Sequence, residues 1–298
     1  MVALGLTAEQ VTQFEKDGYL LLPGELSPER VKALYDETSK LLRDFDITTH
    51  PLTRFSTEEK AHIGDDYFLT SSDKVRFFFE QEAFDEAGKL TRPKEKAINK
   101  IGHALHNLNE HFFADTINDR NRAIARSIGF EDPLVLQSMI ICKQPEIGGK
   151  VPSHQDSVFL YTDPPSAIGF WYALEDCTAE NGALSFVPGS HKWAQIAKRM
   201  IRMNGIKEGT GFIPIDGKET PREPTDGEFI MPTCPAGTLV LIHGSLLHKS
   251  ETNRSQKSRY AYTFHMIEGG EGYTYDKLNW LQIPPTPEGG ANFTHLYA

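Results

Sequence analysis

The sequence predicts a mainly β fold with flanking helices, in which one sandwich or barrel forms the core. Helical periodicity is concentrated in residues 1–130, whereas short apolar runs that alternate with turn residues fill the rest of the chain. A chain of 298 residues with 39% hydrophobic side chains buries a large core. Neither an internal repeat nor a linker divides it, so we expect residues 1–298 to form a single domain.

The chain begins with two predicted helices and a strand between them. Thr7-Ala8-Glu9-Gln10 is a capping box, and Gly18 is expected to end the helix that it starts. Residues 19–22 form an apolar run that is typical of a buried strand. Ser27-Pro28 then supplies an N-cap and a proline at the first helical position, and an amphipathic pattern continues to Phe45.

A loop, a hairpin and two further helices are expected next. Residues 46–65 are polar and have no clear period, which is typical of a loop. The apolar runs at residues 67–69 and 75–79 are separated by turn residues, as in a hairpin. Helical patterns then follow at residues 104–112 and 117–127.

Three histidines lie in and beside the first of these helical patterns: His103, His106 and His111. The segment contains no HExxH motif and no acidic residue at ligand spacing, which a helical zinc site would need. We therefore interpret them as helix-surface histidines rather than as metal ligands.

The strands of the predicted core lie after Pro133. Turn residues separate them, such as Glu180-Asn181-Gly182 and Pro188-Gly189-Ser190. A long insert at residues 192–233 interrupts the series, and we expect it to line a substrate pocket together with the loop at 46–66. The predicted strands are residues 134–142, 158–161, 168–174, 183–187, 238–242 and 260–267.

His154 and Asp156 form a possible metal-binding pair. In an extended segment, side chains two residues apart point the same way, so both can reach one ion. A second histidine would complete the 2-His-1-carboxylate set, which leaves positions on Fe(II) open. However, 11 histidines and 41 acidic residues in 298 positions give about 1.5 His-x-acid patterns by chance, and one occurs. The pair alone therefore remains compatible with a surface histidine beside an aspartate.

A second polar stretch follows the apolar run at residues 239–242. It contains His243, His248 and Ser250, and Arg259 opens the next predicted strand. A serine hydroxyl and a guanidinium fork together suit a carboxylate ligand. By spacing alone, a turn-forming serine and a surface arginine explain the same residues equally well.

These motifs together resemble the phytanoyl-CoA dioxygenase family. The resemblance rests on His154-Gln155-Asp156, on His248-x-Ser250-x-x-Asn253-x-Ser255-x-x-x-Arg259 and on Glu180-Asn181-Gly182-x-Leu184-x-Phe186-x-Pro188-Gly189-Ser190-His191, and it covers most of the chain. It implies a double-stranded β-helix (jelly-roll, cupin-like) core. It also implies a dioxygenase that uses Fe(II), O2 and 2-oxoglutarate and releases succinate and CO2.

The resemblance also implies individual roles. His154, Asp156 and His248 would bind iron, and Arg259 with Ser250 would hold the distal carboxylate of 2-oxoglutarate. Because related halogenases replace the carboxylate ligand with a small residue, Asp156 favours hydroxylation. The residues expected to line the cosubstrate pocket are Lys100, Met139, Gln155 and Trp171, or Tyr172 in place of Trp171, because the preceding segment is one residue shorter than in relatives.

Two histidines compete for the last ligand position. His243 lies directly at the end of the predicted strand, whereas His248 has the family's downstream spacing to Ser250 and Arg259. We therefore expect His248 to be the ligand. Side-chain alternation along a continuous strand would turn His248 away from the face of His243, so a kink near Gly244 is expected as well.

Composition limits the partners and the location. The formal net charge of −10 implies no extended basic face for nucleic acid or a membrane surface. Three cysteines, Cys142, Cys177 and Cys234, are odd in number and far apart, which argues against a disulfide framework and favours a reducing compartment. No apolar run reaches about 18 residues. We expect a cytoplasmic monomer that acts on a small molecule, with ascorbate as a suitable reductant in vitro.

Three alternative functions remain at this point. A zinc hydrolase also uses two histidines and a carboxylate but gives Arg259 and Ser250 no role. A non-catalytic binding module on the same fold needs neither the metal set nor the carboxylate clamp. Phytanoyl-CoA 2-hydroxylase itself is disfavoured by the absence of a C-terminal peroxisomal S-K-L address and by the acidic charge balance.

Overall fold

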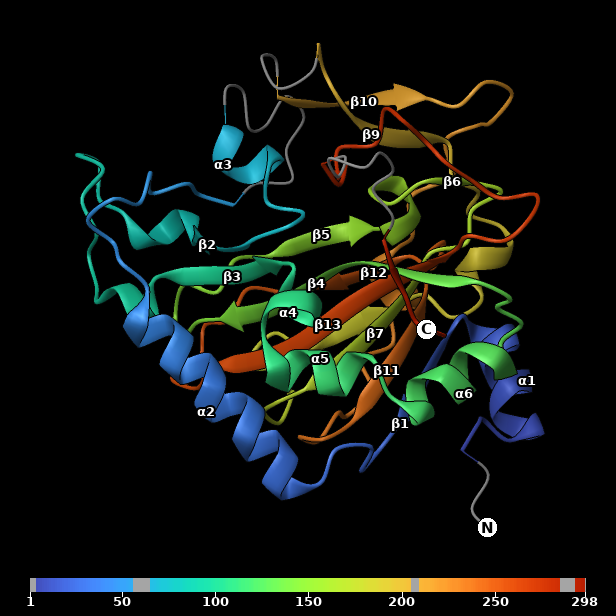
Figure 1. Cartoon of the computed structure of the whole chain (residues 1–298), viewed down its shortest axis with the longest axis horizontal. Coiled ribbons are helices and arrows are strands. Elements are labelled where there is room, and N and C mark those ends of the chain that lie inside the picture. The colour runs from blue at the N-terminus through green and yellow to red at the C-terminus, as the bar shows by residue number, and fades with distance from the viewer. Residues whose placement is uncertain (1–3, 56–64, 205–208, 285–292, 298) are drawn as a thin grey trace.

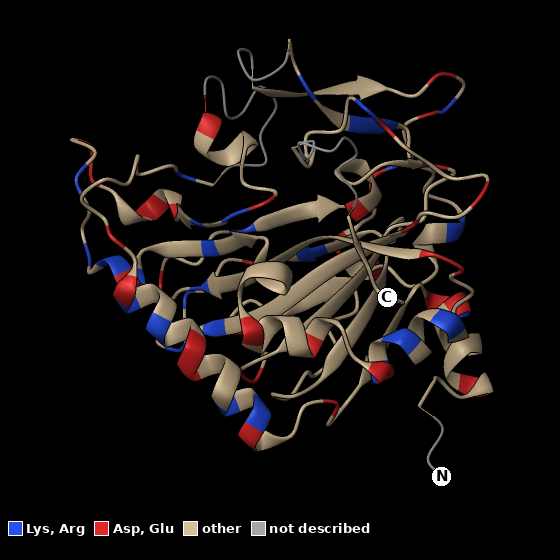
Figure 2. Ribbon diagram, in the orientation of Figure 1, with Lys and Arg blue, Asp and Glu red and all other residues tan. Residues whose placement is uncertain are grey.

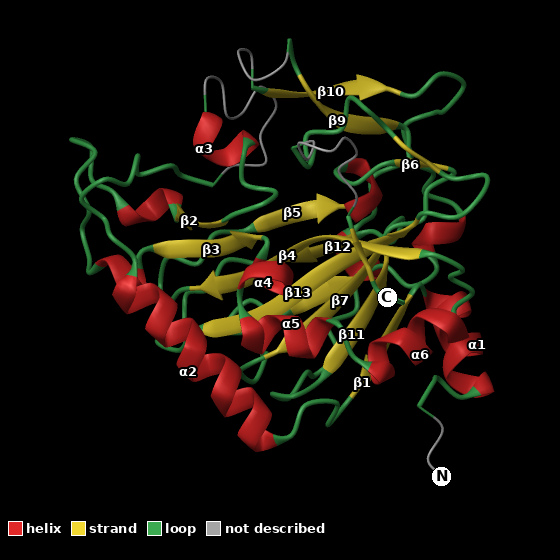
Figure 3. Ribbon diagram, in the orientation of Figure 1, coloured by secondary structure: helices red, strands yellow, loops and turns green. Residues whose placement is uncertain are grey.

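An antiparallel sheet runs through the centre of the molecule (Figures 1 and 3). The computed structural model describes residues 4–55, 65–204, 209–284 and 293–297. The strands of this sheet follow the order β1-β11-β7-β13-β4-β3-β2, and β15 pairs with β4. They are β1 (Tyr19–Leu22), β2 (Val75–Phe79), β3 (Ile98–His103), β4 (Pro133–Lys143), β7 (Ile168–Ala173), β11 (Leu239–His243), β13 (Arg259–Glu268) and β15 (Thr294–His295).

A smaller antiparallel sheet packs on one face of the central sheet. Its strands are β5 (Val151–His154), β12 (His248–Ser250) and β8 (Leu184–Phe186), in the order β5-β12-β8. Trp171 and Ala261 of the central sheet share a buried apolar cluster with Phe186 of the smaller one. The two facing sheets with helices outside them confirm the predicted mainly β, jelly-roll fold.

Helices cover the opposite face of the central sheet (Figure 1). Side chains from helices and from alternate strand positions, such as Phe112, Tyr172 and Phe264, form the largest apolar cluster. Thr7 makes the predicted capping box with Gln10, and Gly18 ends the first helix with φ 80°. The helices are α1 (Ala8–Asp17), α2 (Pro28–Asp44), α3 (Asp66–Leu69), α4 (Leu105–Leu108), α5 (Glu110–Thr116) and α6 (Asp119–Ser127).

The predicted insert at residues 192–233 contains a hairpin of its own. Strands β9 (Lys198–Arg202) and β10 (Thr210–Pro214) pair in antiparallel fashion, and α3 lies near this hairpin at the top of Figure 1. In the loop predicted at 46–66, residues 46–55 carry only an isolated bridge from Arg54 to Phe79, and residues 56–64 lie outside the described part. The remaining short elements are β6 (Thr162–Asp163), β14 (Thr274–Tyr275), η1 (Gln81–Ala83), η2 (Lys94–Lys96), η3 (Asp156–Val158), η4 (Ser190–Lys192) and η5 (Asp226–Glu228).

Two predicted strands are wrong. Residues 67–69 belong to α3, because the Asp65 side chain caps this turn by accepting the Phe68 backbone N–H at 2.9 Å. Their expected partner, β2, pairs instead with β3, a strand that the sequence analysis placed in no element. Residues 158–161 also form no strand, because the chain turns back through η3 directly after Asp156.

The surface position predicted for the histidines is wrong for two of the three. His103 ends β3 and His106 lies in α4, and both are buried. The Ser138 hydroxyl lies 2.8 Å from the His106 ring Nδ1 and accepts the His106 backbone N–H at 2.8 Å, and burial lowers the pKa of His106 to about 4. His111 remains on α5 and is half-buried. Strand β3, which the sequence did not predict, carries His103 into the core, and α4 directly after it carries His106.

The charged residues are interspersed rather than separated by sign. In Figure 2, ribbon segments coloured for acidic and for basic residues are interspersed along α2. Lys32 pairs with Asp36 and Lys40 pairs with Asp44 along the exposed side of this helix. In the parts of the chain that the structure describes, no helix combines the length and apolar character needed to cross a bilayer.

Candidate active site

Two histidines and a carboxylate converge at one end of the smaller sheet. Pairing of β5 with β12 places His154 directly opposite His248, and Asp156 follows as the first residue of η3. The Asp156 Oδ1 atom lies 3.5 Å from His154 Nε2 and 3.7 Å from His248 Nε2. The three atoms all lie within 4.8 Å of one another. Within the described ranges, no other trio of His, Cys, Asp or Glu side chains meets this closely.

Backbone carbonyl groups fix the orientation of both imidazoles. The Nδ1 atom of His154 lies 2.9 Å from the Pro152 carbonyl oxygen, and Nδ1 of His248 lies 3.0 Å from that of Leu246. Each carbonyl can only accept a hydrogen bond from Nδ1–H, so in the neutral form of each ring it is Nε2, the atom on the Asp156 side, that carries the lone pair. This is the arrangement in which histidine binds a metal through Nε2.

A third histidine, which the sequence analysis did not single out, holds the other oxygen of the carboxylate. The Nε2–H group of His265 donates to Asp156 Oδ2 at 3.3 Å, and Gln137 Nε2 donates to His265 Nδ1 at 3.4 Å. His265 lies on β13 six residues after Arg259, so strand alternation places both on one face. That parity is the signal in the sequence that would have identified His265.

The site favours an ionised carboxylate at Asp156 and a neutral imidazole at His248. Burial opposes ionisation of Asp156, but the surrounding rings of His248, His265 and His154 hold its pKa well below the usual value. Burial and the neighbouring His154 lower the pKa of His248 to about 4. Burial also acts against protonation of His154, yet Asp156 raises its pKa. An anionic carboxylate flanked by imidazole lone pairs suits a divalent cation such as Fe(II).

Arg259 is buried beneath this site with unused hydrogen-bond donors. Its Nη2 donates to Ser250 Oγ at 3.2 Å, and Ser250 donates in turn to the Gly182 carbonyl at 2.8 Å. Its Nε and Nη1 atoms are buried and have no hydrogen-bond partner among the described residues. Burial lowers the pKa of Arg259, which is the direction expected for a desolvated cation. Because unpaired buried donors are costly, this group fits a carboxylate ligand such as that of 2-oxoglutarate.

Trp171 and Tyr172 point to opposite sides of β7. The Arg259 guanidinium carbon lies 5.2 Å from the centroid of the Trp171 ring. The Tyr172 hydroxyl instead donates to Asn121 of α6 at 2.7 Å, on the helix-covered face. Trp171 is therefore the residue that shares a face with Arg259.

Strand register places Lys100 and Met139 on the same face as Arg259. Arg259 pairs with Lys143 of β4, and Lys100 pairs with Ile141 of the same strand. Lys143, Ile141 and Met139 are two residues apart along β4 and so point to one face, and directly paired residues share that face. The Lys100 Nζ atom lies 3.5 Å from the centroid of the Phe55 ring, and burial lowers the pKa of Lys100 to about 7.

The structure does not bring Gln155 to the same place. Its amide nitrogen donates to the backbone carbonyls of Ala194 at 2.5 Å and Ser245 at 2.7 Å. Alternation in the extended chain directs this side chain away from His154 and Asp156. The geometry therefore fits a residue that joins two loops beneath the site.

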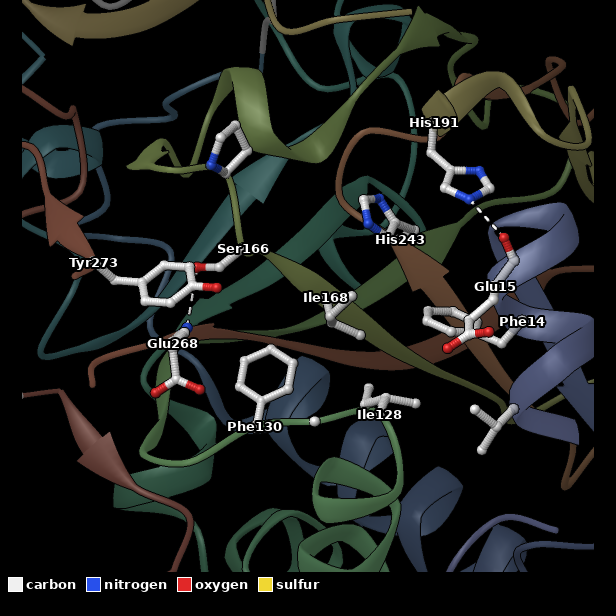
Figure 4. A pocket seen from close by; sticks show the side chains of 13 residues that line it. Phe14, Glu15, Ile128, Phe130, Ser166, Ile168, His191, His243, Glu268 and Tyr273 are labelled. Carbon is white, nitrogen blue, oxygen red and sulfur yellow. Dashed lines mark hydrogen bonds between the residues drawn. The ribbon is translucent and has the colours of Figure 1, made fainter. Parts of the chain in front are cut away.

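His243 lies apart from the cluster. It ends β11, and its ring centroid lies 6.3 Å from that of Phe14 and 4.9 Å from that of His191. Figure 4 shows it lining a cavity of about 330 Å³ with residues of α1, and none of the three clustered residues lines this cavity. The kink expected between the two histidines lies at Gly244, directly after the end of β11. A Cβ atom at this position would overlap the Ser157 hydroxyl and the Ala167 carbonyl oxygen.

A double-stranded β-helix with a His-Asp-His cluster on its smaller sheet is typical of non-heme iron oxygenases. The family description "Phytanoyl-CoA dioxygenase (PhyH)" matches residues 14–261. The chain therefore belongs to the phytanoyl-CoA dioxygenase family and is an enzyme of the oxygenase type.

Curated relatives match over nearly the whole chain. Phytanoyl-CoA dioxygenase domain-containing protein 1 of Bos taurus is 45% identical over 290 residues, which cover 95% of this chain and 96% of the relative. Phytanoyl-CoA dioxygenase of Arabidopsis thaliana is 41% identical over 283 residues, with 95% and 96% covered.

Solved structures share the fold at low identity. The α-ketoglutarate-dependent epimerase SnoN from nogalamycin biosynthesis superposes with a TM-score of 0.60 at 15% identity, covering 96% of this chain and 92% of that one. EctD from S. alaskensis, crystallised with 2-oxoglutarate and 5-hydroxyectoine, gives 0.56 at 19% identity, covering 88% and 76%. At these identities the likeness supports the fold.

Proposed function

We propose that the protein is an Fe(II)- and 2-oxoglutarate-dependent dioxygenase that hydroxylates a small molecule. His154, Asp156 and His248 bind the iron, and Arg259 with Ser250 binds the distal carboxylate of 2-oxoglutarate. The observation that carries the proposal is the buried Arg259, whose Nε and Nη1 donors have no partner among the described residues. Neither a zinc hydrolase nor a non-catalytic module gives these donors a purpose.

Iron at the cluster supplies oxygen activation coupled to decarboxylation of 2-oxoglutarate to succinate and CO2. The protein's own contribution is positional. The Pro152 and Leu246 carbonyls hold both imidazoles, and His265 holds one carboxylate oxygen of Asp156. Trp171, Lys100 and Met139 form the wall beside Arg259 and exclude water from the cosubstrate.

Hydroxylation is the outcome that Asp156 favours, since it occupies the position of the carboxylate ligand. SnoN is described as an epimerase and SnoK as a carbocyclase, so the shared fold accommodates other outcomes. The name of the Arabidopsis thaliana relative favours phytanoyl-CoA as a second candidate substrate. A net charge of −10 makes a polyanionic CoA thioester a poor match, and we propose another small molecule.

The test is succinate formation by purified protein with Fe(II), ascorbate, O2 and 2-oxoglutarate. Wild type and an Asp216→Ala variant, which changes an exposed aspartate, are expected to form succinate, whereas Asp156→Ala is expected to form none. Equal succinate from wild type and Asp156→Ala would refute the proposal.

The assignment of the third ligand has its own variants. His248→Ala is expected to lose bound iron and succinate formation, and His243→Ala to keep both, because His243 packs against Phe14 and His191. The reverse result would show that the ligand register is wrong.

The substrate is sought by comparing extracts that contain wild-type protein with extracts that contain Asp156→Ala. Oxygenated products specific to the wild type identify the substrate, and phytanoyl-CoA is assayed in parallel. Hydroxylation of phytanoyl-CoA as efficient as that of any compound found would establish the second candidate instead.

A further inference from the structure

Two cysteines that are far apart in the sequence face each other in the fold. Cys177 follows β7 and Cys234 precedes β11, and the two form an antiparallel bridge. The Cys177 backbone N–H donates to the Cys234 carbonyl at 2.8 Å. Both thiols are free and buried, with exposed fractions of 2% and 6%. Nothing in the sequence relates them, because only the pairing of β7 with β11 brings them together.

The spacing of such a pair permits a disulfide, but a strained one. Residues of a hydrogen-bonded antiparallel pair have Cα atoms about 5.5 Å apart, inside the range of roughly 4.4–6.8 Å found for disulfides. Their Cβ atoms lie about 4.5–5.5 Å apart, at or above the roughly 3.5–4.5 Å of a relaxed disulfide. A bond formed under such strain is readily reduced, so it suits reversible chemistry rather than permanent stabilisation.

The two thiols differ in reactivity. The Cys177 S–H group lies 3.4 Å from the Glu175 carbonyl oxygen and also forms a side-chain hydrogen bond with Cys234. This bond from Cys177 lowers the pKa of Cys234, while the same bond and burial raise the pKa of Cys177. The positive charge of Arg259 favours both thiolates. Cys234 is also the more exposed of the two and lies between the exposed residues Thr233 and Pro235, so we take Cys234 as the nucleophile and Cys177 as the resolving thiol.

The pair lies close to the protein surface. Both cysteines line a cavity of about 10 Å³ together with Pro232, and the neighbouring Thr233 and Pro235 are exposed. A cavity of that size is at the lower limit for one water molecule and is smaller than hydrogen peroxide, so oxidation requires local opening of the exposed segment around Cys234. Cys142, the third cysteine, is fully buried in the helix-side cluster and serves as an internal control.

We propose that Cys177 and Cys234 form a reversible redox-modification site that hydrogen peroxide oxidises to a disulfide. The Cys234 thiolate attacks the O–O bond, which breaks to give a sulfenic acid and hydroxide. The Cys177 sulfur then attacks the sulfenic sulfur, and the S–O bond breaks. In sum, two thiols and one peroxide give one disulfide and two waters, and a dithiol reductant restores both thiols by exchange.

The disulfide would alter the environment of Arg259. Trp171 lines the same small cavity as the two cysteines, and the Arg259 guanidinium lies over the Trp171 ring. Drawing the sulfurs to bonding distance repacks this cavity, and we expect the oxidised protein to bind 2-oxoglutarate more weakly. This second step rests on the proposed function, whereas formation of the disulfide does not.

The test treats reduced, purified protein with hydrogen peroxide, alkylates the remaining thiols in denaturant and maps the peptides without reduction. We expect loss of two of the three thiols, a peptide linking positions 177 and 234, alkylated Cys142, and recovery of all three thiols with dithiothreitol. Asp156→Ala is treated in parallel, since linkage in both proteins separates peroxide chemistry from chemistry at a bound metal.

Single variants test the order of events. Cys177→Ser should leave a sulfenic acid at Cys234 that dimedone traps, and Cys234→Ser should leave Cys177 unmodified. In the wild-type protein, retention of three thiols, equal oxidation of Cys142, or disulfides only between molecules would overturn the proposal. These outcomes are measured on the wild-type protein and therefore do not depend on whether a variant folds. A mapped link with unchanged 2-oxoglutarate affinity would overturn the effect on Arg259 alone.

Discussion

At the scale of single residues, Arg259 explains why the site needs an anionic ligand. A guanidinium that is 1% exposed loses its hydration, and the serine hydroxyl of Ser250 satisfies only one of its nitrogens. Binding of a carboxylate supplies the missing acceptors in a charge-assisted bidentate contact. The fold thus leaves two Arg259 donors without acceptors among the described residues, and a bound carboxylate would supply those acceptors.

Arg259→Ala is expected to weaken 2-oxoglutarate binding far more than iron binding, because the side chain contacts no clustered ligand. Loss of a charge-assisted contact costs about 2–4 kcal/mol, or roughly 30- to 1000-fold in affinity. Titration of 2-oxoglutarate into the Fe(II)-loaded protein without oxygen measures the dissociation constant. Ser250→Ala, which removes one hydrogen bond to Arg259, should have a smaller effect. An unchanged dissociation constant in Arg259→Ala would place the carboxylate site elsewhere.

His265 acts on the iron site through Asp156. Its Nε2–H donor fixes one carboxylate oxygen, which leaves Oδ1 turned towards the two histidines. Loss of such a contact typically lowers metal affinity about 10- to 100-fold. His265→Ala should show that loss in a metal-competition assay. His265→Gln, whose amide can donate from a similar position, should recover part of it, and equal losses in both variants would contradict this role.

Sequence alone located most, but not all, of these residues. The i, i+2 spacing indicated His154 and Asp156, and downstream spacing selected His248 over His243. His265 belongs to no local motif, and its even spacing from Arg259 on β13 is the one sequence signal for it; its contact with Asp156 depends on the pairing of β13 with β4 and β7. Gln155 was placed beside the cosubstrate by resemblance, but its amide binds two backbone carbonyls.

At the scale of elements, the sequence predicted helix and strand boundaries correctly where residues close in sequence make the hydrogen bonds that fix them. The capping box at Thr7 and the stop at Gly18 are satisfied within α1. Prediction failed where pairing with distant residues decides. The strand β3 carries Asn99, Lys100 and His103, which reads as a polar segment, yet β2 and β4 pair with it on both sides. Long-range pairing overrides local propensity in such segments.

Gly244 sets the path from β11 to β12. Its N–H donates to the Ala167 carbonyl at 2.7 Å, and its carbonyl accepts the Ser157 N–H at 2.9 Å. Gly244→Ala should therefore overpack this turn, cost about 1–3 kcal/mol of stability and weaken iron binding by displacing His248. Gly227→Ala is the matched control, because its added Cβ meets no atom within 4 Å. Equal thermal stability and iron affinity in the two variants would rule out this constraint.

At the scale of the whole molecule, two facing sheets bring strands from separate parts of the chain to one site. The proposed iron ligands lie on the smaller sheet or, for Asp156, directly after it, and Arg259 lies on the central sheet, so the proposed site exists only when both sheets have assembled. That residues 1–298 act as a single domain and a monomer stays a prediction. Global stability should accordingly depend on buried charges near the junction of the two sheets, where Glu80 and Lys143 both contact Gly149.

Glu80 makes stability depend on pH in a definite direction. Burial raises the pKa of this carboxyl from 4.5 to about 7 in the folded protein. Between those pH values the Glu80 site binds more protons in the folded than in the unfolded state, so the contribution of this group to stability is fully present below pH 4.5 and is lost as pH rises through 7. The loss amounts to about 3 kcal/mol across this window.

Glu80→Gln removes this dependence while it keeps the shape of the side chain. Lys143 strengthens the contrast, because loss of the Glu80 charge lowers the pKa of this buried lysine further. Urea unfolding at pH 5, 6 and 7 should therefore show the variant gaining stability relative to wild type as pH rises. Glu82→Gln, in an exposed ion pair with Arg254, is the control and should follow the wild type. Parallel stability curves for wild type and Glu80→Gln would show that Glu80 is ionised in the folded protein throughout this range.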